Sequence, residues 1–135
     1  GMKTTIRLFT VPEQIFCNAS IKSILQDADG VIFVADSQET KLQDNVNSFN
    51  HLVENFKTLK LDIKTMPLVL QWNKRDQPNI APVGILEEQI NYLKVPSFEA
   101  EASNGKGVFP TLKKCVALVL KLVDDQANGS AAEKT

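Results

Sequence analysis

Residues 68–76 read LVLQWNKRD, an apolar run that ends abruptly in Asn73, Lys74 and, one residue further on, Asp76. A short apolar run of this kind is typical of a strand that is buried on both faces of a parallel sheet. The polar residues then stand where the strand ends. An ordinary turn, in which Asn73 or Asp76 bonds to nearby backbone, accounts for them as well as a binding site does. The surrounding sequence is needed to choose between the two.

Strand and helix patterns alternate on both sides of this run. The patterns predict strands over residues 6–9, 30–35, 68–72 and 97–100, and helices over 11–27, 42–56, 84–93 and 107–124. Strict alternation implies right-handed crossovers and a mainly parallel sheet with helices on both faces. We therefore expect a three-layer α/β fold in a single domain, residues 1–124. The polar residues 125–135 are expected to form a frayed tail.

Composition excludes several classes of function. The chain has 135 residues, 43% of them hydrophobic, which is enough for one domain with its own core. Its formal net charge of -1 creates no global field for nucleic acid or an anionic membrane. No apolar run approaches the roughly 20 residues of a membrane span. Cys17 and Cys115 lie far apart without CxxC spacing or a secretory signal, which predicts reduced thiols in a cytoplasmic protein. The sequence shows no cluster of metal ligands.

Polar residues follow two strands that we expect to be neighbours. Asn73, Lys74 and Asp76 follow the third predicted strand, and EAEASNG at 99–105 follows the fourth. Parallel α/β sheets bind ligands beyond the carboxyl ends of their strands. A carboxylate there can accept hydrogen bonds from N1 and N2 of guanine, an Asn can bridge the base and the other loop, and a Lys stem can lie on the purine face. A backbone N–H of the second loop can meet guanine O6. Adenine presents the opposite donor and acceptor pattern, so these groups predict a guanine site.

The same stretches resemble those of a known family, the Ras-like small GTPases, over nearly the whole chain. NKRD at 73–76 resembles the guanine motif NKxD, and EAEASNGKGV at 99–108 is similar to the second base-recognition loop. TVPEQ at 10–14 and GVIFVADSQ at 30–38 are closer still to a bacterial group of gliding and polarity GTPases, which carry TVPGQ. The resemblance implies the small G-protein variant of the P-loop NTPase fold.

The resemblance also implies roles for particular residues. Ala102 would supply the N–H that meets guanine O6, and Gln14 matches the glutamine that orients the attacking water, so it is a vestigial catalytic candidate. The implied guanine-binding set is Asn73, Lys74, Asp76, Ala102 and Ser103. Trp72 adjoins this set, and its fluorescence is expected to respond when a base binds.

The phosphate-binding part of the family pattern has no match in these residues. The chain contains no GxxxxGK[ST]; Gly105-Lys106 lacks the earlier Gly and precedes Gly107 instead of Ser or Thr. Glu13 stands where the family has a Gly that approaches the γ-phosphate. Each charge-assisted hydrogen bond contributes roughly 1.5–3 kcal/mol, so losing several removes tight nucleotide binding. We expect the chain as given to need no cofactor, and GTP or GDP with magnesium only for a full-length family member.

Three functional interpretations follow. The favoured one is a pseudo-GTPase that binds guanine nucleotide weakly, does not hydrolyse it and acts through a protein partner. The second is a fragment of an active GTP-hydrolysing gliding and polarity switch, produced by a misassigned start codon. The third is an α/β interaction domain with no nucleotide role, which requires both base loops to be accidental.

The resemblance has a further consequence for the sheet. In the Ras-like order, a strand with no counterpart here lies between those predicted at 6–9 and 30–35. Buried backbone groups left unpaired cost roughly 1–3 kcal/mol each. Either the strand at 6–9 slides across to pair with the strand at 30–35, or a second molecule supplies a strand. Together with apolar surface left uncovered on residues 116–123, this predicts a homo-oligomer.

Overall fold

The computed structural model describes residues 7–8, 10 and 19–133. Helices and strands alternate through this part of the chain, as the sequence patterns predict. In order, the elements are α1 Ala19–Asp27, β1 Val31–Asp36, the 3₁₀ turn η2 Glu39–Lys41, α2 Leu42–Thr58, β2 Leu68–Asn73, α3 Val83–Gln89, β3 Ser97–Glu99, the 3₁₀ turn η3 Ala102–Asn104 and α4 Val108–Glu133.

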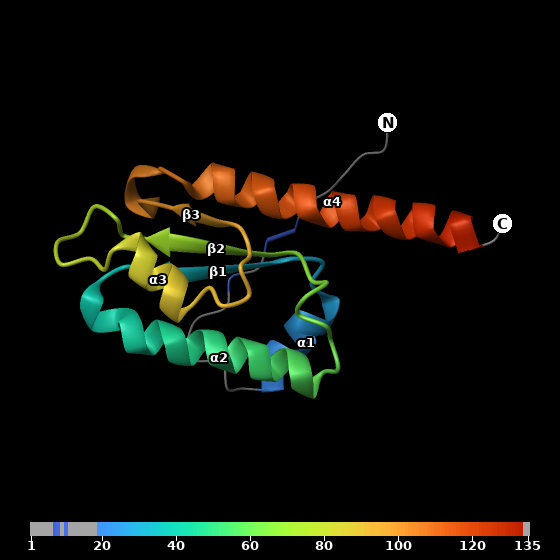
Figure 1. Cartoon of the computed structure of the whole chain (residues 1–135), viewed down its shortest axis with the longest axis horizontal. Helices are drawn as coiled ribbons and strands as arrows, with labels where there is room; N and C mark the ends of the chain where they lie inside the picture. Colours follow the sequence, from blue (N-terminus) through green and yellow to red (C-terminus); the bar gives the residue numbers. More distant parts are fainter. Residues whose placement is uncertain (1–6, 9, 11–18, 134–135) are drawn as a thin grey trace.

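The described strands form one parallel sheet in the order β1-β2-β3. Val31 lies opposite Leu68 and Asp36 opposite Asn73, whereas β3 pairs with only residues 70–72 of β2. The sheet lies between α4 on one face and α2 on the other (Figure 1). This arrangement confirms the predicted α/β fold with a parallel sheet between helical layers.

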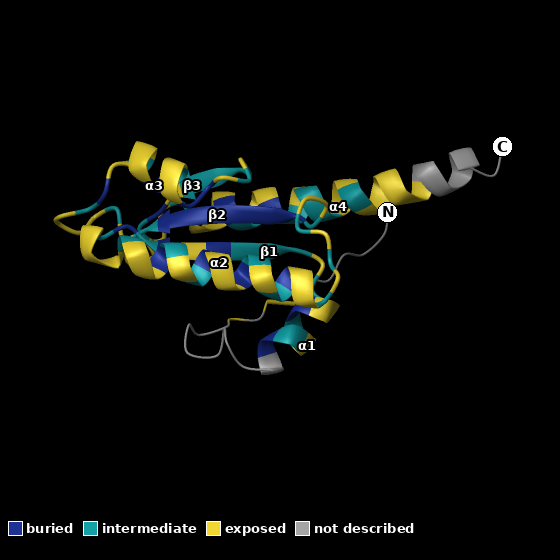
Figure 2. Cartoon of the chain, turned by 60° about the horizontal axis from the view of Figure 1, so that its bottom comes forward, coloured by how far each residue is buried: buried dark blue, intermediate teal, exposed yellow. Residues whose placement is uncertain are grey.

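The central strand β2 is buried on both faces, which explains its uninterrupted apolar run. Residues 68–72 are all buried, and β2 stands out as the buried centre of the molecule in Figure 2. On the α2 face, Phe49 meets the ring of Phe33 edge to face, with 5.2 Å between ring centroids. The main core on this face combines side chains of the sheet with those of α1, α2 and α3: Ile21, Leu25, Phe33, Ala35, Phe49, Leu52, Phe56, Leu68, Leu70, Trp72, Leu86 and Ile90.

Helix α4 lies close against the opposite face. The Nε2 of Gln71 donates a hydrogen bond to the Oγ1 of Thr111 in α4 over 2.8 Å, and both side chains are buried. At Gly30, an added Cβ would lie 2.8 Å from the Cγ2 of Val119 and 3.0 Å from the Sγ of Cys115, so a larger residue would force these side chains to move. Cys115 is a buried free thiol, as predicted, and burial raises its pKa. Cys17 lies outside the described residues.

Two predicted helix ends were wrong. Helix α3 ends at Gln89 instead of residue 93, because the Asn91 side chain bonds both the N–H and the C=O of Val95 and closes a turn there. Helix α4 continues to Glu133 instead of ending near residue 124. Residues 125–133 include three alanines as well as Gln126 and Glu133, which favour helix, and a helix that has already nucleated extends through further residues without a new nucleus. Polarity alone therefore placed the predicted end of this helix too early.

The predicted strand at 6–9 is not seen in the part of it that the structure describes. Arg7 and Leu8 are exposed and lie in no strand, and residues 6 and 9 fall outside the described part. The sliding arrangement, in which this segment pairs with β1, is therefore not present in the described residues. The early turns of the helix predicted at 11–27 also lie outside them, while its end at Asp27 is confirmed.

In the described sheet, β1 is an edge strand. The N–H of Val31 donates to Pro67 and that of Ser37 to Asn73, so the odd-numbered residues of β1 face β2. The backbone groups of Ile32, Val34 and Asp36 face the other way. Those of Asp36 are bonded to Asn45, whose Oδ1 accepts from the N–H over 3.2 Å and whose Nδ2 donates to the C=O over 2.7 Å. Within residues 19–133, the unpaired part of the edge is thus centred on Ile32 and Val34.

Apolar side chains are exposed on the face that carries α4. Val34 in β1 is 53% exposed. Four apolar side chains of α4 are exposed as well: Val108, Phe109, Leu120 and Val123. This agrees with the expectation of uncovered apolar surface near residues 116–123. Among the described residues, no helix combines the length and the apolar character needed to cross a membrane.

Candidate functional site

Strand β2 ends in a turn that spreads its polar side chains in different directions. Lys74 has a left-handed φ of 65°, which is uncommon for a residue with a side chain. Just before it, the Oδ1 of Asn73 accepts a hydrogen bond from the N–H of Ala102 over 2.9 Å. This bond joins the two predicted base loops directly; contact of Asn73 with a base stays a prediction.

Lys74 is anchored to the neighbouring strand. Its Nζ lies 3.0 Å from the Oδ2 of Asp36 at the end of β1, and the other oxygen of Asp36 accepts the N–H of Gln38. The Lys74 side chain is 49% exposed, so the pair is only partly shielded from water. The ammonium group is therefore held on the β1 side of the turn, where its stem remains available to a planar ligand.

The second loop follows β3 and is shaped by its backbone. The turn η3 ends at Gly105, which has a left-handed φ of 78°, and Lys106 pairs back with Glu101. The N–H of Ala102, expected to meet guanine O6, is donated to Asn73 in this structure. A base bound here must share this N–H with Asn73 or displace the amide oxygen.

The two loops enclose a shallow cavity. Its volume is about 290 Å³, and its lining consists of the five predicted guanine-binding residues and Gln77. Asp76 and Ser103 are exposed at this cavity, and the Nε2 of Gln77 lies 3.4 Å from the Oδ2 of Asp76. The structure therefore brings together Asn73, Lys74, Asp76, Ala102 and Ser103, while Gln14 lies outside the described residues. The guanine-binding role of this set remains a prediction.

Trp72 is a poorer reporter of this cavity than its position suggests. Its side chain is 1% exposed and faces the core, where its Nε1 donates to the Oε1 of Glu87 over 3.1 Å. Burial opposes ionisation of Glu87, but hydrogen bonds from Ser97, Asn91 and Trp72 outweigh it and lower the pKa. A bound base could reach the indole only indirectly, so NMR of the loop amides is the better measurement.

Sequence reasoning overlooked Arg75, the variable position of NKRD. Its side chain turns inward and is only 16% exposed, with its Nε 3.1 Å from the Oε1 of Glu99 in β3. No periodic pattern exists inside a turn of this kind, so the sequence offers no signal that distinguishes an inward side chain from an outward one. The contact becomes visible only when β3 is placed beside β2.

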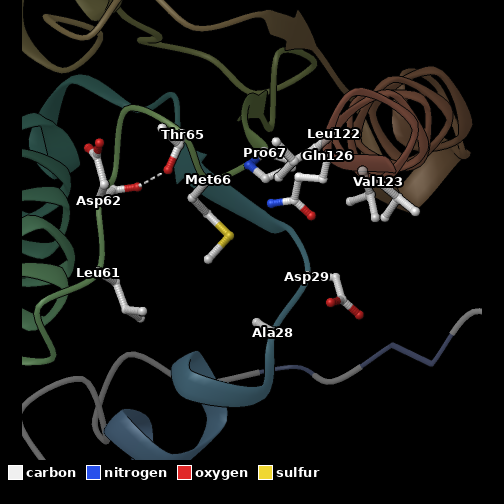
Figure 3. A pocket seen from close by; sticks show the side chains of 11 residues that line it. Ala28, Asp29, Leu61, Asp62, Thr65, Met66, Pro67, Leu122, Val123 and Gln126 are labelled. Atoms are coloured by element: carbon white, nitrogen blue, oxygen red, sulfur yellow. Dashed lines mark hydrogen bonds between the residues drawn. The ribbon is translucent and has the colours of Figure 1, made fainter. Parts of the chain in front are cut away.

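A second cavity lies at the opposite, amino-terminal end of the strands (Figure 3). Its volume is about 220 Å³, and it lies between α4, the segment before β1 and the segment before β2. Met66 and Pro67 contribute apolar surface, Asp29 contributes a carboxylate, and the Thr65 hydroxyl donates to the Asp62 carbonyl. None of the predicted site residues lines this cavity.

Comparison with known proteins agrees with the resemblance seen in the sequence. No family model matches the chain. The chain is 43% identical over 120 residues to the mutual gliding-motility protein MglA of Myxococcus xanthus (strain DK1622), and the match covers 89% of the chain. It spans 62% of the length of that relative.

Proposed function

We propose that this homologue of MglA recognises the guanine base weakly through its two loops and does not hydrolyse GTP with these residues alone. The observation that carries the proposal is the hydrogen bond between Asn73 and Ala102, which closes one cavity around the whole predicted base-binding set. The two loops thereby present Asp76 and Ala102 to the same cavity.

The donor and acceptor pattern favours guanine. Asp76, exposed at the cavity, can accept from N1–H and N2–H of the base, and the N–H of Ala102 can donate to O6. Adenine would place a donor against Ala102 and no N1 donor against Asp76. Charge-assisted hydrogen bonds contribute about 1.5–3 kcal/mol each, part of which ordering of the ligand offsets. We therefore expect a dissociation constant of about 1 mM or weaker, about -4 kcal/mol.

Titration with GMP and AMP tests base recognition, because the two ligands share the same ribose and phosphate. GMP should shift the amide resonances of Asn73, Asp76 and Ala102, and AMP should shift them at least about fivefold less at equal concentration. In Asp76→Asn, XMP should bind more tightly than GMP, the reverse of the order in the unchanged protein. The amide of Asn can donate a hydrogen bond to O2 of xanthine, whereas the carboxylate of Asp76 repels that oxygen. Asp29→Asn, an equal change at the far cavity, should leave the preference for GMP. Equal responses to GMP and AMP would contradict the proposal.

Hydrolysis of GTP by this chain is expected to be no faster than the uncatalysed background at any magnesium concentration. Phosphoryl transfer depends on groups that position and neutralise the phosphates, and these 135 residues contain no GxxxxGK[ST]. Gln14 alone cannot supply that positioning, and Glu13→Gly should not create activity. Phosphate release should be measured on chromatographically clean protein. Magnesium-dependent release that scales with protein concentration would contradict the prediction.

The match to 62% of MglA also supports an alternative, an active GTP-hydrolysing switch formed with additional chain. DNA immediately upstream of Met2 that encodes GxxxxGK[ST] in the same reading frame would favour it. Either way, the relative's name connects the proposal to gliding motility. From the sequence resemblance we also propose a role in cell polarity and a cytoplasmic location. Exposed apolar side chains on α4 support action through a protein partner. A domain with no nucleotide role is the remaining candidate, and the GMP and AMP titration distinguishes it.

A further inference from the structure

Arg75 is the shielded residue of an otherwise exposed turn. Its side chain is 16% exposed, compared with 49% for Lys74 immediately before it. Arginine is seldom buried without partners, because removing its charge from water is costly. The partners of Arg75 therefore indicate what the turn requires of it.

Three contacts connect Arg75 to two other segments of the chain. Its Nη1 donates to the carbonyl oxygen of Ala81 over 2.6 Å, and its Nε to the Oε1 of Glu99 over 3.1 Å. Its backbone N–H donates to the carbonyl oxygen of Ala100 over 3.1 Å. The planar guanidinium holds its donors in fixed directions, so it can set the relative position of the two segments.

The Ala81 segment is itself firmly placed. The N–H of Ala81 donates to Ser37 over 2.8 Å, and the N–H of Ser37 donates to Asn73 over 3.0 Å. Ser37 and Ala81 are both buried. These bonds connect Asn73 to Ser37 at the end of β1 and Ser37 to Ala81. The side chain of Arg75 closes the ring by bonding to Ala81. The guanidinium thus bonds to a position that the sheet already fixes.

We infer that Arg75 is a positioning residue of the guanine site, setting the separation between Asp76 on one wall and Ala102 on the other. The inference rests on the proposed function. Asp76 follows Arg75 directly, and Ala102 follows Glu99 and Ala100, which Arg75 holds. Guanine presents O6 and its N1 and N2 groups at a fixed separation, so both walls read it only when their spacing is right. Without the Arg75 side chain, the walls are held together by the Asn73–Ala102 bond, the short β3 ladder and the backbone bond from residue 75 to the Ala100 carbonyl.

Two substitutions separate the geometry of Arg75 from its charge. Arg75→Ala should weaken GMP binding about tenfold and leave AMP binding unchanged. The ratio of the AMP dissociation constant to the GMP dissociation constant would then fall close to one. Arg75→Lys keeps the charge beside Glu99 but lacks the fork that also reaches Ala81, so an intermediate loss of about threefold is expected. Lys57→Ala provides the control, because Lys57 pairs with Glu54 on the exposed side of α2, 3.5 Å away. It should bind GMP as the unchanged protein does.

Amide hydrogen exchange without ligand supplies a second readout. In Arg75→Ala, the N–H of Ala102 should exchange about tenfold faster, while that of Phe33 in β1 keeps its protection. Unchanged GMP binding and preference in Arg75→Ala would overturn this inference and leave the proposed function standing. Equal loss of protection at Phe33 would show a general stabilising role and overturn it as well. If the unchanged protein does not prefer GMP to AMP, the proposed function fails and the inference fails with it.

Discussion

Replacing Gly107 with alanine is expected to destabilise the protein by about 3 kcal/mol or more, a large part of the roughly 5–15 kcal/mol by which ordinary domains are stable. An added Cβ would lie 2.1 Å from the carbonyl oxygen of Glu99 and 2.8 Å from the Cα of Ala100. Both neighbours are backbone atoms, so no side chain can rotate away. Relief requires β3 and the start of α4 to separate, which would also displace the loop that carries Ala102.

Gly105→Ala is the matched control for this prediction. Gly105 and Gly107 have left-handed φ values of 78° and 77°, but a Cβ on Gly105 would meet nothing within 4 Å. Gly105→Ala should therefore cost only the left-handed conformation, about 1–2 kcal/mol. Urea unfolding monitored by circular dichroism gives both free energies of unfolding. Equal losses for the two variants would show that the close approach at Gly107 contributes little.

The open edge of β1 leads to the second prediction, a change of oligomeric state. We propose that two copies of the chain pair their β1 strands antiparallel about a two-fold axis at Phe33. Ile32 of each copy then lies opposite Val34 of the other. In this register the outward N–H and C=O groups of Ile32 bond to those of Val34 in the other copy. Asn45 already bonds those of Asp36, and this register does not require them. The edge itself carries no Lys, Pro or bulge of the kind that discourages such pairing.

Light scattering coupled to size-exclusion chromatography tests the proposal at about 50 μM protein. The unchanged chain should elute at twice its mass of 14.9 kDa, and Val34→Lys should elute as a monomer. Val123→Lys makes the same change on α4 at nearly the same exposure, 54% against 53%, and should remain a dimer. A monomeric unchanged chain contradicts the proposal. Loss of the dimer only in Val123→Lys would locate the interface on α4 instead.

The order and type of the described elements could be predicted from local sequence. Strand β2 was predictable because burial on both faces demands an uninterrupted apolar run, and α2 because Phe49, Leu52 and Phe56 recur at helical spacing. The alternation of the elements then implied that the loops after β2 and β3 meet at one edge of the sheet. The membership of the candidate site was implied by the resemblance of the NKRD and EAEASNG stretches to the base loops of the family, and this topology placed the two stretches together without knowledge of any contact.

Contacts between distant segments were decided only by the tertiary structure. Neighbouring residues in a turn have no periodicity, so the inward direction of Arg75 and the donation of the Ala102 N–H to Asn73 depend on where β3 lies. The different demands on Gly105 and Gly107 arise because only Gly107 packs against the β3 backbone. Local sequence determined which segments become helices and strands, since hydrophobic periodicity acts within each segment. The packing of segments far apart in the chain determined which polar groups are free to bind, since each group's partner lies on another segment.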